Sequence, residues 1–305
     1  MQVFLEDRDF SGAESVGDRK NQEDFHAFQL MDRGEGLLLV LADGMGGHEA
    51  GEVASSMAVD SFVLNFRQHG AQSIPVKLGA ALQSADNSLA NHIASHRQSE
   101  GMGCTLVGAY VSSACLYWIS VGDSPLYLFR KGKLRQINED HSMAPEIEKS
   151  LKAGKLTPEE ARNHPNRNAL RSAVMGEGHS PLVDCPAKPF PLAPGDLILL
   201  ASDGVQSLSG SEIADVLTKH INMPMQEVAT VLLRAVQKKQ RRNQDNTTVQ
   251  LVRIPLNTTA PKRRLRSRWI LVCSAIVMIV VIFGTYALFD KIGLTIDLNA
   301  LLQMK

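Results

Sequence analysis

The chain has 305 residues, with 32 basic and 32 acidic side chains and a formal net charge of zero. This charge is unevenly spread, because five basic residues and no acidic residue lie between Lys262 and Arg268, so the rest of the chain is mildly acidic. A mildly acidic body argues against nucleic acid as a main partner. The four cysteines have neither CxxC nor zinc-ligand spacing, which is typical of reduced thiols in a cytosolic protein. The N-terminal residues lack the basic and apolar regions of a signal peptide.

Apolar runs and helical stripes predict one mixed domain of helices and strands over residues 1–254. Strands are expected at Leu37–Ala42, Thr105–Val111, Cys115–Val121, Leu126–Arg130, Leu197–Ser202 and Thr247–Ile254. Helices are expected at Ala50–Phe66, Val76–His96, Ser211–His220 and Met225–Gln240. Tight turns such as Lys131-Gly132-Lys133 favour antiparallel pairing of a meander between about residues 103 and 137. The pattern therefore differs from regular βαβ alternation.

A long polar excursion covers residues 138–190. It contains several prolines, and it predicts a helix near Ala144–Leu151 and a helix start at Thr157-Pro158-Glu159-Glu160. Excursions of this length are often functional. Its basic side chains are candidates for substrate selection, although such residues are more often simply solvated.

The C-terminal region predicts a membrane anchor. Residues 255–268 form a linker with a juxtamembrane basic cluster, and Trp269–Phe289 contains no charged residue. At ~1.5 Å per residue this apolar segment matches a hydrocarbon core of ~30 Å. The basic cluster predicts that the preceding domain is cytoplasmic, with residues 290–305 as a short extracytoplasmic tail. We therefore expect a single-pass protein of the inner membrane, and the cluster is also a candidate for contact with anionic lipid.

Polar segments with carboxylates follow or precede several predicted strands. Asp43-Gly44 and Asp203-Gly204 each come directly after an apolar run. Three further polar segments lie at 19–24, 122–124 and 244–248. One Asp-Gly pair alone is most often a surface turn. Five such segments at strand ends predict carboxylates that converge from distant parts of the chain, and oxygen ligands of this kind suit Mg²⁺ or Mn²⁺.

These motifs, in this order, resemble the metal-dependent Ser/Thr protein phosphatases, the PPM or type 2C family, in its bacterial branch. The matching motifs are Arg-x-x-x-Glu-Asp at 19–24, Ala-Asp-Gly-Met-Gly-Gly-His at 42–48, Gly-Cys-Thr at 103–105, Gly-Asp-Ser at 122–124, Ser-Asp-Gly at 202–204 and Asp-Asn at 245–246. The resemblance implies an α+β fold, a four-layer α-β-β-α sandwich of two antiparallel sheets flanked by helices. The excursion at 138–190 matches the position of the family's flap.

The resemblance also implies a centre of two Mg²⁺ or Mn²⁺ ions at one edge of the sandwich. Asp43 is expected to bridge the two ions. Asp203 and Asp245 are expected to complete one ion site, and Glu23 and the Gly44 carbonyl are expected to serve the other.

Three further residues receive roles from the same resemblance. Asp24 is expected to bind directly or through water, and Asp123, with Asp203, matches a third and weaker metal position. Arg19 is expected to hold the substrate phosphate, since a guanidinium can bind two phosphate oxygens at once. Clustered carboxylates stay ionised together only beside cations. A hydroxide bridging the two ions could then attack phosphorus in line.

Two positions depart from the pattern of many family members. Met45 stands where many eukaryotic members have a histidine that is thought to protonate the leaving alkoxide, and a thioether cannot do so. His48 or water is an alternative proton donor, although a structural role for His48 is the more common case. Pro125 replaces an arginine that often follows Gly-Asp-Ser, which affects a salt bridge rather than the metal ligands.

The expected function is hydrolysis of phosphoserine and phosphothreonine in proteins, at the cytoplasmic face of the membrane and in opposition to a Ser/Thr kinase. Two alternatives stay open. One is a regulatory phosphatase of the partner-switching type, which shares the fold and differs in substrate. The other is a non-catalytic phosphoprotein-binding module, although such relatives usually lose Asp43, Asp203 or Asp245.

Overall fold

The computed structural model describes residues 4–31, 36–46, 50–71, 73–112, 114–176 and 181–256. All of these residues belong to one compact unit, Met1–Thr258. The predicted anchor at 269–289, the tail at 290–305 and the basic cluster of the linker lie outside the described residues. Among the helices within the described ranges, none combines the length and the apolar character that a bilayer crossing needs.

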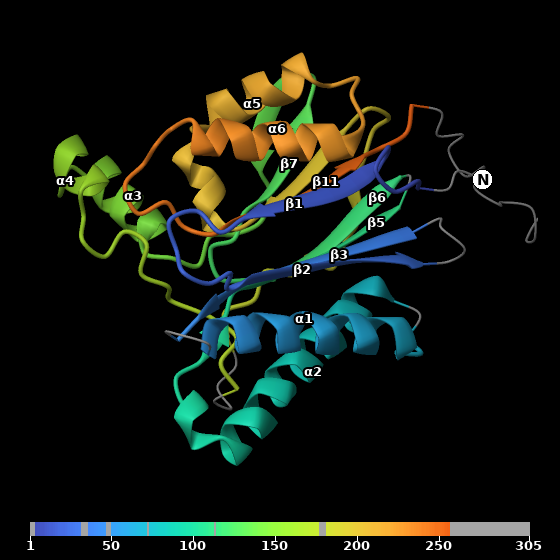
Figure 1. The fold of residues 1–305 in the computed structure, drawn as a ribbon, viewed down its shortest axis with the longest axis vertical. Helices are drawn as coiled ribbons and strands as arrows, with labels where there is room; N and C mark the ends of the chain where they lie inside the picture. Colours follow the sequence, from blue (N-terminus) through green and yellow to red (C-terminus); the bar gives the residue numbers. More distant parts are fainter. Residues whose placement is uncertain are drawn as a thin grey trace, which may run out of the picture. The chain divides into compact units, whose positions relative to one another are not determined.

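Two antiparallel sheets form the centre of the unit (Figure 1). The first has the strand order β1-β11-β10-β7-β8, and the second has the order β2-β3-β5-β6-β9, with β4 paired to β3. The strands are β1 (Phe10–Ser15), β2 (Asp24–Met31), β3 (Gly36–Met45), β4 (Gly103–Cys104), β5 (Leu106–Ser112), β6 (Cys115–Val121), β7 (Leu126–Arg130), β8 (Lys133–Gln136), β9 (Phe190–Pro191), β10 (Leu197–Ala201) and β11 (Thr247–Arg253). The expected pair of antiparallel sheets is therefore confirmed.

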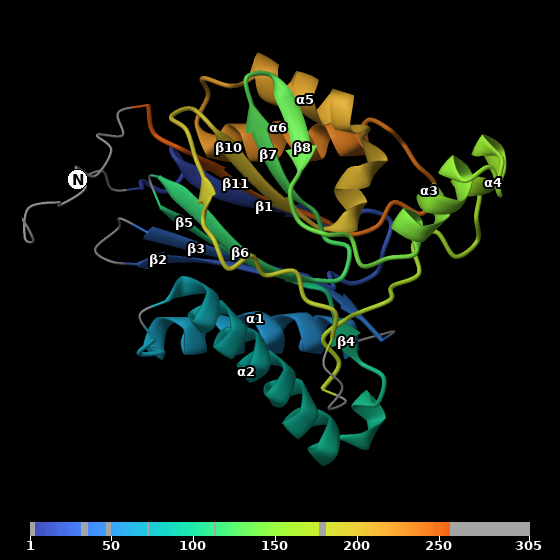
Figure 2. The same ribbon diagram turned by 180° about the vertical axis from the view of Figure 1, so that it is seen from behind.

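Helices cover the outer face of each sheet, which gives the four layers (Figure 2). The second sheet is covered by α1 (Ala50–Gln68) and α2 (Ile74–Ser95), and the first by α5 (Gly210–Lys219) and α6 (Met225–Gln237). Short 3-10 turns follow α2 at η2 (Arg97–Ser99) and β10 at η3 (Asp203–Ser207).

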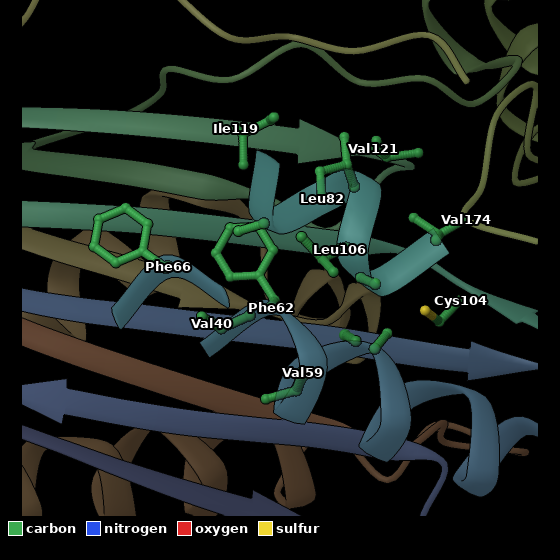
Figure 3. Packing of buried hydrophobic residues seen from close by; sticks show 14 of the residues in the cluster. Val40, Val59, Phe62, Phe66, Leu82, Cys104, Leu106, Ile119, Val121 and Val174 are labelled. Carbon is green, nitrogen blue, oxygen red and sulfur yellow. The ribbon is translucent and has the colours of Figure 1, made fainter. Parts of the chain in front are cut away.

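The strand β3 is buried on both faces, as expected for a continuous apolar run between two layers. Leu38 and Val40 pack into the cluster beneath α1 and α2, whereas Leu37 and Leu39 pack between the two sheets. Figure 3 shows the first cluster, with the ring of Phe62 from α1 close to the strands.

A glycine in β5 makes room for that ring. A Cβ atom on Gly108 would come within 2.5 Å of the ring of Phe62. The close approach of α1 to the sheet therefore depends on the missing side chain.

The predicted strands and helices agree with the observed ones except at their ends, and the short strands β4, β8 and β9 were not predicted individually. The predicted strands Cys115–Val121 and Leu126–Arg130 coincide with β6 and β7. The strand β3 runs on to Met45, past its predicted end at Ala42. The strands β1 and β2 were not among the predicted strands. Their sequences mix polar and small residues with apolar ones, because both carry partly exposed faces.

The flap contains the two helical segments that the sequence predicts, α3 (Ala144–Lys152) and α4 (Pro158–Arg162). The helix α4 begins at a capping box, in which the Thr157 hydroxyl accepts from the Glu160 amide and the Glu160 carboxylate accepts from the Thr157 amide. Figures 1 and 2 both show α3 and α4 projecting from one end of the sandwich.

Candidate metal centre

A cavity of about 370 Å³ gathers residues from segments far apart in the sequence. Its lining includes seven of the eight predicted site residues: Arg19, Glu23, Asp43, Gly44, Asp123, Asp203 and Asp245. The eighth, Asp24, does not line the cavity and is only 3% exposed. The predicted convergence of these residues at one edge of the sandwich is therefore present in the structure.

Backbone pairing places Asp43 beside Asp24. The two residues are direct partners in the antiparallel register of β2 and β3. The Asp43 amide donates to the Thr105 hydroxyl at 3.0 Å, and the Asp43 carbonyl accepts from the Thr105 amide at 2.9 Å. Asp43 therefore lies within β3, with Asp24 of β2 on one side and Thr105 on the other, rather than after the end of the strand.

Asp24 is buried outside the cavity lining, and only one of its two carboxylate oxygens accepts a hydrogen bond. Its Oδ2 accepts a hydrogen bond of 2.7 Å from the Ser202 hydroxyl. Its Oδ1 is buried and has no hydrogen-bond partner. Burial raises the pKa of Asp24 to about 7, against the opposing effects of the Ser202 and Thr248 hydroxyls beside the carboxylate. An unpartnered buried carboxylate oxygen of this kind fits a cation or a water bound to one.

Glu23 and Gly44 are tied together at the same edge. The Gly44 amide donates to the Glu23 carbonyl at 3.0 Å, and the Glu23 amide donates to the Asn246 side chain at 2.8 Å. A Cβ atom on Gly44 would meet the Gly51 carbonyl oxygen at 2.1 Å. Only glycine fits there, so the backbone at Gly44 can lie directly against the cavity.

The segment that leads into β11 also lines the cavity, through Asp245. Asn246 donates through its side chain to the carbonyls of Val16 at 2.9 Å and Asn21 at 3.0 Å, which fixes the 16–23 segment against this strand. The Arg19 guanidinium donates to Asp245 Oδ2 at 2.6 Å. Arg19 and Asp245 are partly exposed, so both can be reached from the cavity.

The carboxylates raise one another's pKa in addition to the effect of burial. The pKa of Asp43 lies well above its ordinary value, first because of burial and then because of the charges of Asp24, Asp203 and Asp123. Burial and the Asp203 charge raise the pKa of Asp123 to about 7. Burial and the Asp245 charge raise the pKa of Asp203 to about 6. Such a group of acids is costly to ionise without a nearby cation.

The donor chemistry fits divalent metal ions, because every side-chain donor predicted for the centre is an oxygen. Within the described ranges, no group of three or more His, Cys, Asp or Glu side chains already has the arrangement of a metal site. The residues present would hold the ions through the carboxylates named above.

Several residues of the site were not predicted as such. Asn168 and Leu170 of the flap line the cavity, and Ser202 holds Asp24. No local pattern marks the flap residues, whereas Ser202 belongs to the Ser-Asp-Gly motif. Met45 lines the cavity as well, and His48 lies outside the described residues.

Comparisons with known proteins agree with this geometry. The model of the family "Protein phosphatase 2C" matches residues 11–245. The serine/threonine phosphatase stp of Listeria welshimeri is 34% identical over 220 residues, which cover 70% of this chain and 83% of that protein.

Solved structures show the same similarity. The serine/threonine phosphatase PstP/Ppp of Mycobacterium tuberculosis has a TM-score of 0.67 and 30% identity, covering 81% of this chain and 98% of that one. The catalytic domain of a serine/threonine protein phosphatase PstP in complex with two manganese ions has a TM-score of 0.65 and 29% identity, covering 80% of this chain and 96% of that one. The family match, the sandwich and the cavity agree, and this chain belongs to the protein phosphatase 2C family.

Proposed function

We propose that this chain is a metal-dependent phosphatase that removes phosphoryl groups from serine and threonine residues of proteins. The observation that carries this function is the single cavity that Arg19 shares with Asp43, Asp203 and Asp245. The relatives named above are serine/threonine phosphatases, and one of them binds two manganese ions. The same dependence on Mn²⁺ or Mg²⁺, with two ions, follows for this chain.

The residues of the cavity can each contribute to hydrolysis of a phosphomonoester. Two divalent ions held by the carboxylates would lower the pKa of the attacking water and offset charge on the phosphoryl oxygens. The Arg19 guanidinium binds and orients those oxygens. Asp24, which accepts a hydrogen bond from Ser202, lies beside Asp43 in the sheet and helps to position it. The water oxygen forms the new bond to phosphorus as the bond to the serine or threonine oxygen breaks, and that oxygen takes up a proton.

Hydrolysis of p-nitrophenyl phosphate and of a phosphothreonine peptide by the full-length chain tests this function. Activity is expected with Mn²⁺ or Mg²⁺ and not with chelator, and it is expected to be lost in Asp43→Ala and Asp203→Asn. Asp60→Asn serves as the control, because Asp60 is an exposed carboxylate on α1 that does not line the cavity. Activity that survives chelation would refute the metal-dependent reaction, and inactivity with every metal would favour a binding module.

We also propose that the domain is tethered to the cytoplasmic face of the inner membrane and opposes a Ser/Thr kinase. The support is the uncharged sequence Trp269–Phe289 and the basic cluster that precedes it. A reporter fused after Lys305 is expected to lie outside the cytoplasm, and a cytoplasmic reporter would contradict this orientation. Phosphothreonine that accumulates in membrane fractions when the chain is deleted, and disappears with an added kinase inhibitor, would support the opposing kinase.

A further inference from the structure

A second cavity, of about 770 Å³, opens directly beside the metal centre. Both cavities are lined by Asn168, Asp203 and Asp245, so they share a wall. The remaining lining comes from the flap at 162–168, from η3 and from the 241–245 segment between α6 and β11. Figures 1 and 2 both show the segment after α6 running beside the flap helices.

This second cavity is basic. Arg162, Arg167, Arg241 and Arg242 line it, and the acidic residues of its lining are the two aspartates of the metal centre. Arg167 is paired with Glu148 at 3.4 Å. Within the described residues, no ion pair joins Arg162, Arg241 or Arg242 to a carboxylate. Three exposed guanidinium groups therefore remain available to a ligand.

The arginine pair at 241–242 is flanked by two bends and is followed by an anchored residue. Gln240 and Asn243 have positive φ values of 47° and 57°, so two tight bends flank the pair. After the second bend, the Gln244 side chain donates to the Gly204 carbonyl at 3.2 Å and accepts from the Ser207 hydroxyl at 2.5 Å. The backbone just after the two arginines is thus tied to η3, which begins with Asp203.

We propose that this basic cavity binds an anionic group of the substrate, so that the enzyme favours phosphoprotein segments with carboxylates or a second phosphoryl group near the phosphoresidue. The inference rests on the proposed function. A chain whose phosphoresidue lies at the metal centre reaches the arginines across the shared wall. Guanidinium groups bind carboxylate and phosphate oxygens through paired hydrogen bonds. Arg162 on the flap and Arg241 and Arg242 on the opposite side contact the bound segment from two directions.

The test compares three phosphothreonine peptides that differ only beside the phosphoresidue. One carries neutral residues, one carries two aspartates and one carries a second phosphoserine, each placed in turn on the N-terminal and the C-terminal side. For the full-length chain with Mn²⁺, kcat/KM is expected to be roughly five- to tenfold higher for an anionic peptide, mainly through KM, since partly exposed charge pairs contribute modestly. High salt is expected to reduce this ratio.

The role of the arginines is tested by the ratio of kcat/KM for the anionic peptide to kcat/KM for the neutral peptide, measured within each variant. Arg241→Gln/Arg242→Gln is expected to bring the ratio to within about twofold of unity. The control Arg67→Gln/Arg97→Gln removes the same charge from exposed arginines outside both cavities and is expected to keep the ratio. Arg162→Gln tests the flap side independently and is expected to lower the ratio in part.

The outcomes separate this inference from the proposed function. Metal-dependent hydrolysis of p-nitrophenyl phosphate with equal kcat/KM for all peptides would overturn the basic subsite and leave the phosphatase function standing. A ratio preserved in both arginine variants would also overturn it. Fluorescence anisotropy of the same peptides reads binding without turnover. A preference for anionic peptides in binding, combined with no hydrolysis, would instead refute the phosphatase function alone.

Discussion

The Arg19 guanidinium donates to Asp245 Oδ2 at 2.6 Å, although 226 residues separate the two in the sequence. Asp245 raises the pKa of Arg19 through this hydrogen bond, so the guanidinium stays charged. Asp245 is also a proposed metal ligand. A cation held by Asp245 would compete with Arg19 for the carboxylate, and the Arg19 guanidinium would then be available to the oxygens of a phosphate.

Arg19→Ala is expected to lower kcat/KM for a phosphothreonine peptide by roughly 10²- to 10³-fold, the cost of one donor to developing phosphoryl charge. Arg19→Lys is expected to be intermediate, because an ammonium cannot bind two oxygens in one plane. Arg8→Ala is the matched control, since Arg8 also pairs with an aspartate, Asp9, outside the cavity. Equal activity of Arg19→Ala and Arg8→Ala would exclude a role for Arg19 in phosphate binding.

The carboxylate cluster predicts how stability depends on pH when metal is removed by a chelator. The pKa values of Asp123 and Asp203 are raised in the fold to about 7 and about 6. A raised pKa means that the folded protein holds these protons more tightly than the unfolded chain, so the stabilisation is complete below about pH 4 and is lost as pH rises through 6 to 7. The melting temperature of the metal-free chain is therefore expected to fall between pH 5 and pH 8.

Two experiments, addition of metal and removal of one carboxylate, distinguish this electrostatic effect from a general loss of stability at high pH. Mn²⁺ is expected to raise the melting temperature most at pH 8, where the carboxylates are ionised. Asp43→Asn is expected to raise the melting temperature of the metal-free chain at pH 8, by roughly 2–4 °C per kcal/mol of relief, while abolishing activity. A melting temperature that does not change with pH under chelation would contradict the electrostatic account. Differential scanning calorimetry provides the measurement.

Ser202→Ala tests the support of Asp24. The substitution removes the serine hydrogen bond from Oδ2 of the buried Asp24 carboxylate, and it also removes the acceptor of the Thr248 amide. The expected loss of unfolding free energy is about 1–3 kcal/mol, with weaker Mn²⁺ binding in a calorimetric titration. Thr230→Ala is the control, because this hydroxyl bonds only within α6 and is exposed. A Ser202 variant with unchanged metal affinity would limit the serine to a structural role.

Gly44→Ala tests the close approach of backbone at the centre. The added methyl group would meet the carbonyl oxygens of Gly51 at 2.1 Å and Glu23 at 2.7 Å. The expected destabilisation is about 1–3 kcal/mol or more, together with loss of activity. Gly79→Ala in α2 meets nothing within 4 Å and is expected to stabilise the chain by about 0.5–1 kcal/mol. Chemical denaturation of both variants measures the contrast, and equal stabilities would contradict the packing at Gly44.

The sequence predicted those parts of the fold and site that have a local signature. The apolar runs 37–42 and 197–201 lie in β3 and β10, and Asp43 and Asp203 come at or just after their ends, so their shared edge could be inferred. The strand β2 was missed because both of its faces are only partly buried and carry polar residues, His26 on one face and Gln29 on the other, so no clear alternation marks it.

Contacts between distant segments had no such signature. The bond from Ser202 to Asp24 spans 178 residues, and nothing near either residue specifies its partner. Asn168 and Leu170 line the cavity because of the course of the flap backbone, which the local sequence does not specify. The position of the 241–245 segment in the same cavity wall as the flap could not be predicted either, because a basic dipeptide after a helix is usually a solvated surface.

The hydrogen bond between Ser202 and Asp24 also joins the two sheets, because Ser202 follows β10 in one and Asp24 opens β2 in the other. Burial and the charges of the neighbouring acids make the ionised carboxylates beside this junction unfavourable, and bound cations would offset that cost. Loss of metal should therefore loosen the seam of the sandwich, with faster amide exchange at the ends of β2 and β10 and easier entry for proteases. The concentration of divalent ions would then determine the lifetime of the folded protein as well as its catalytic rate.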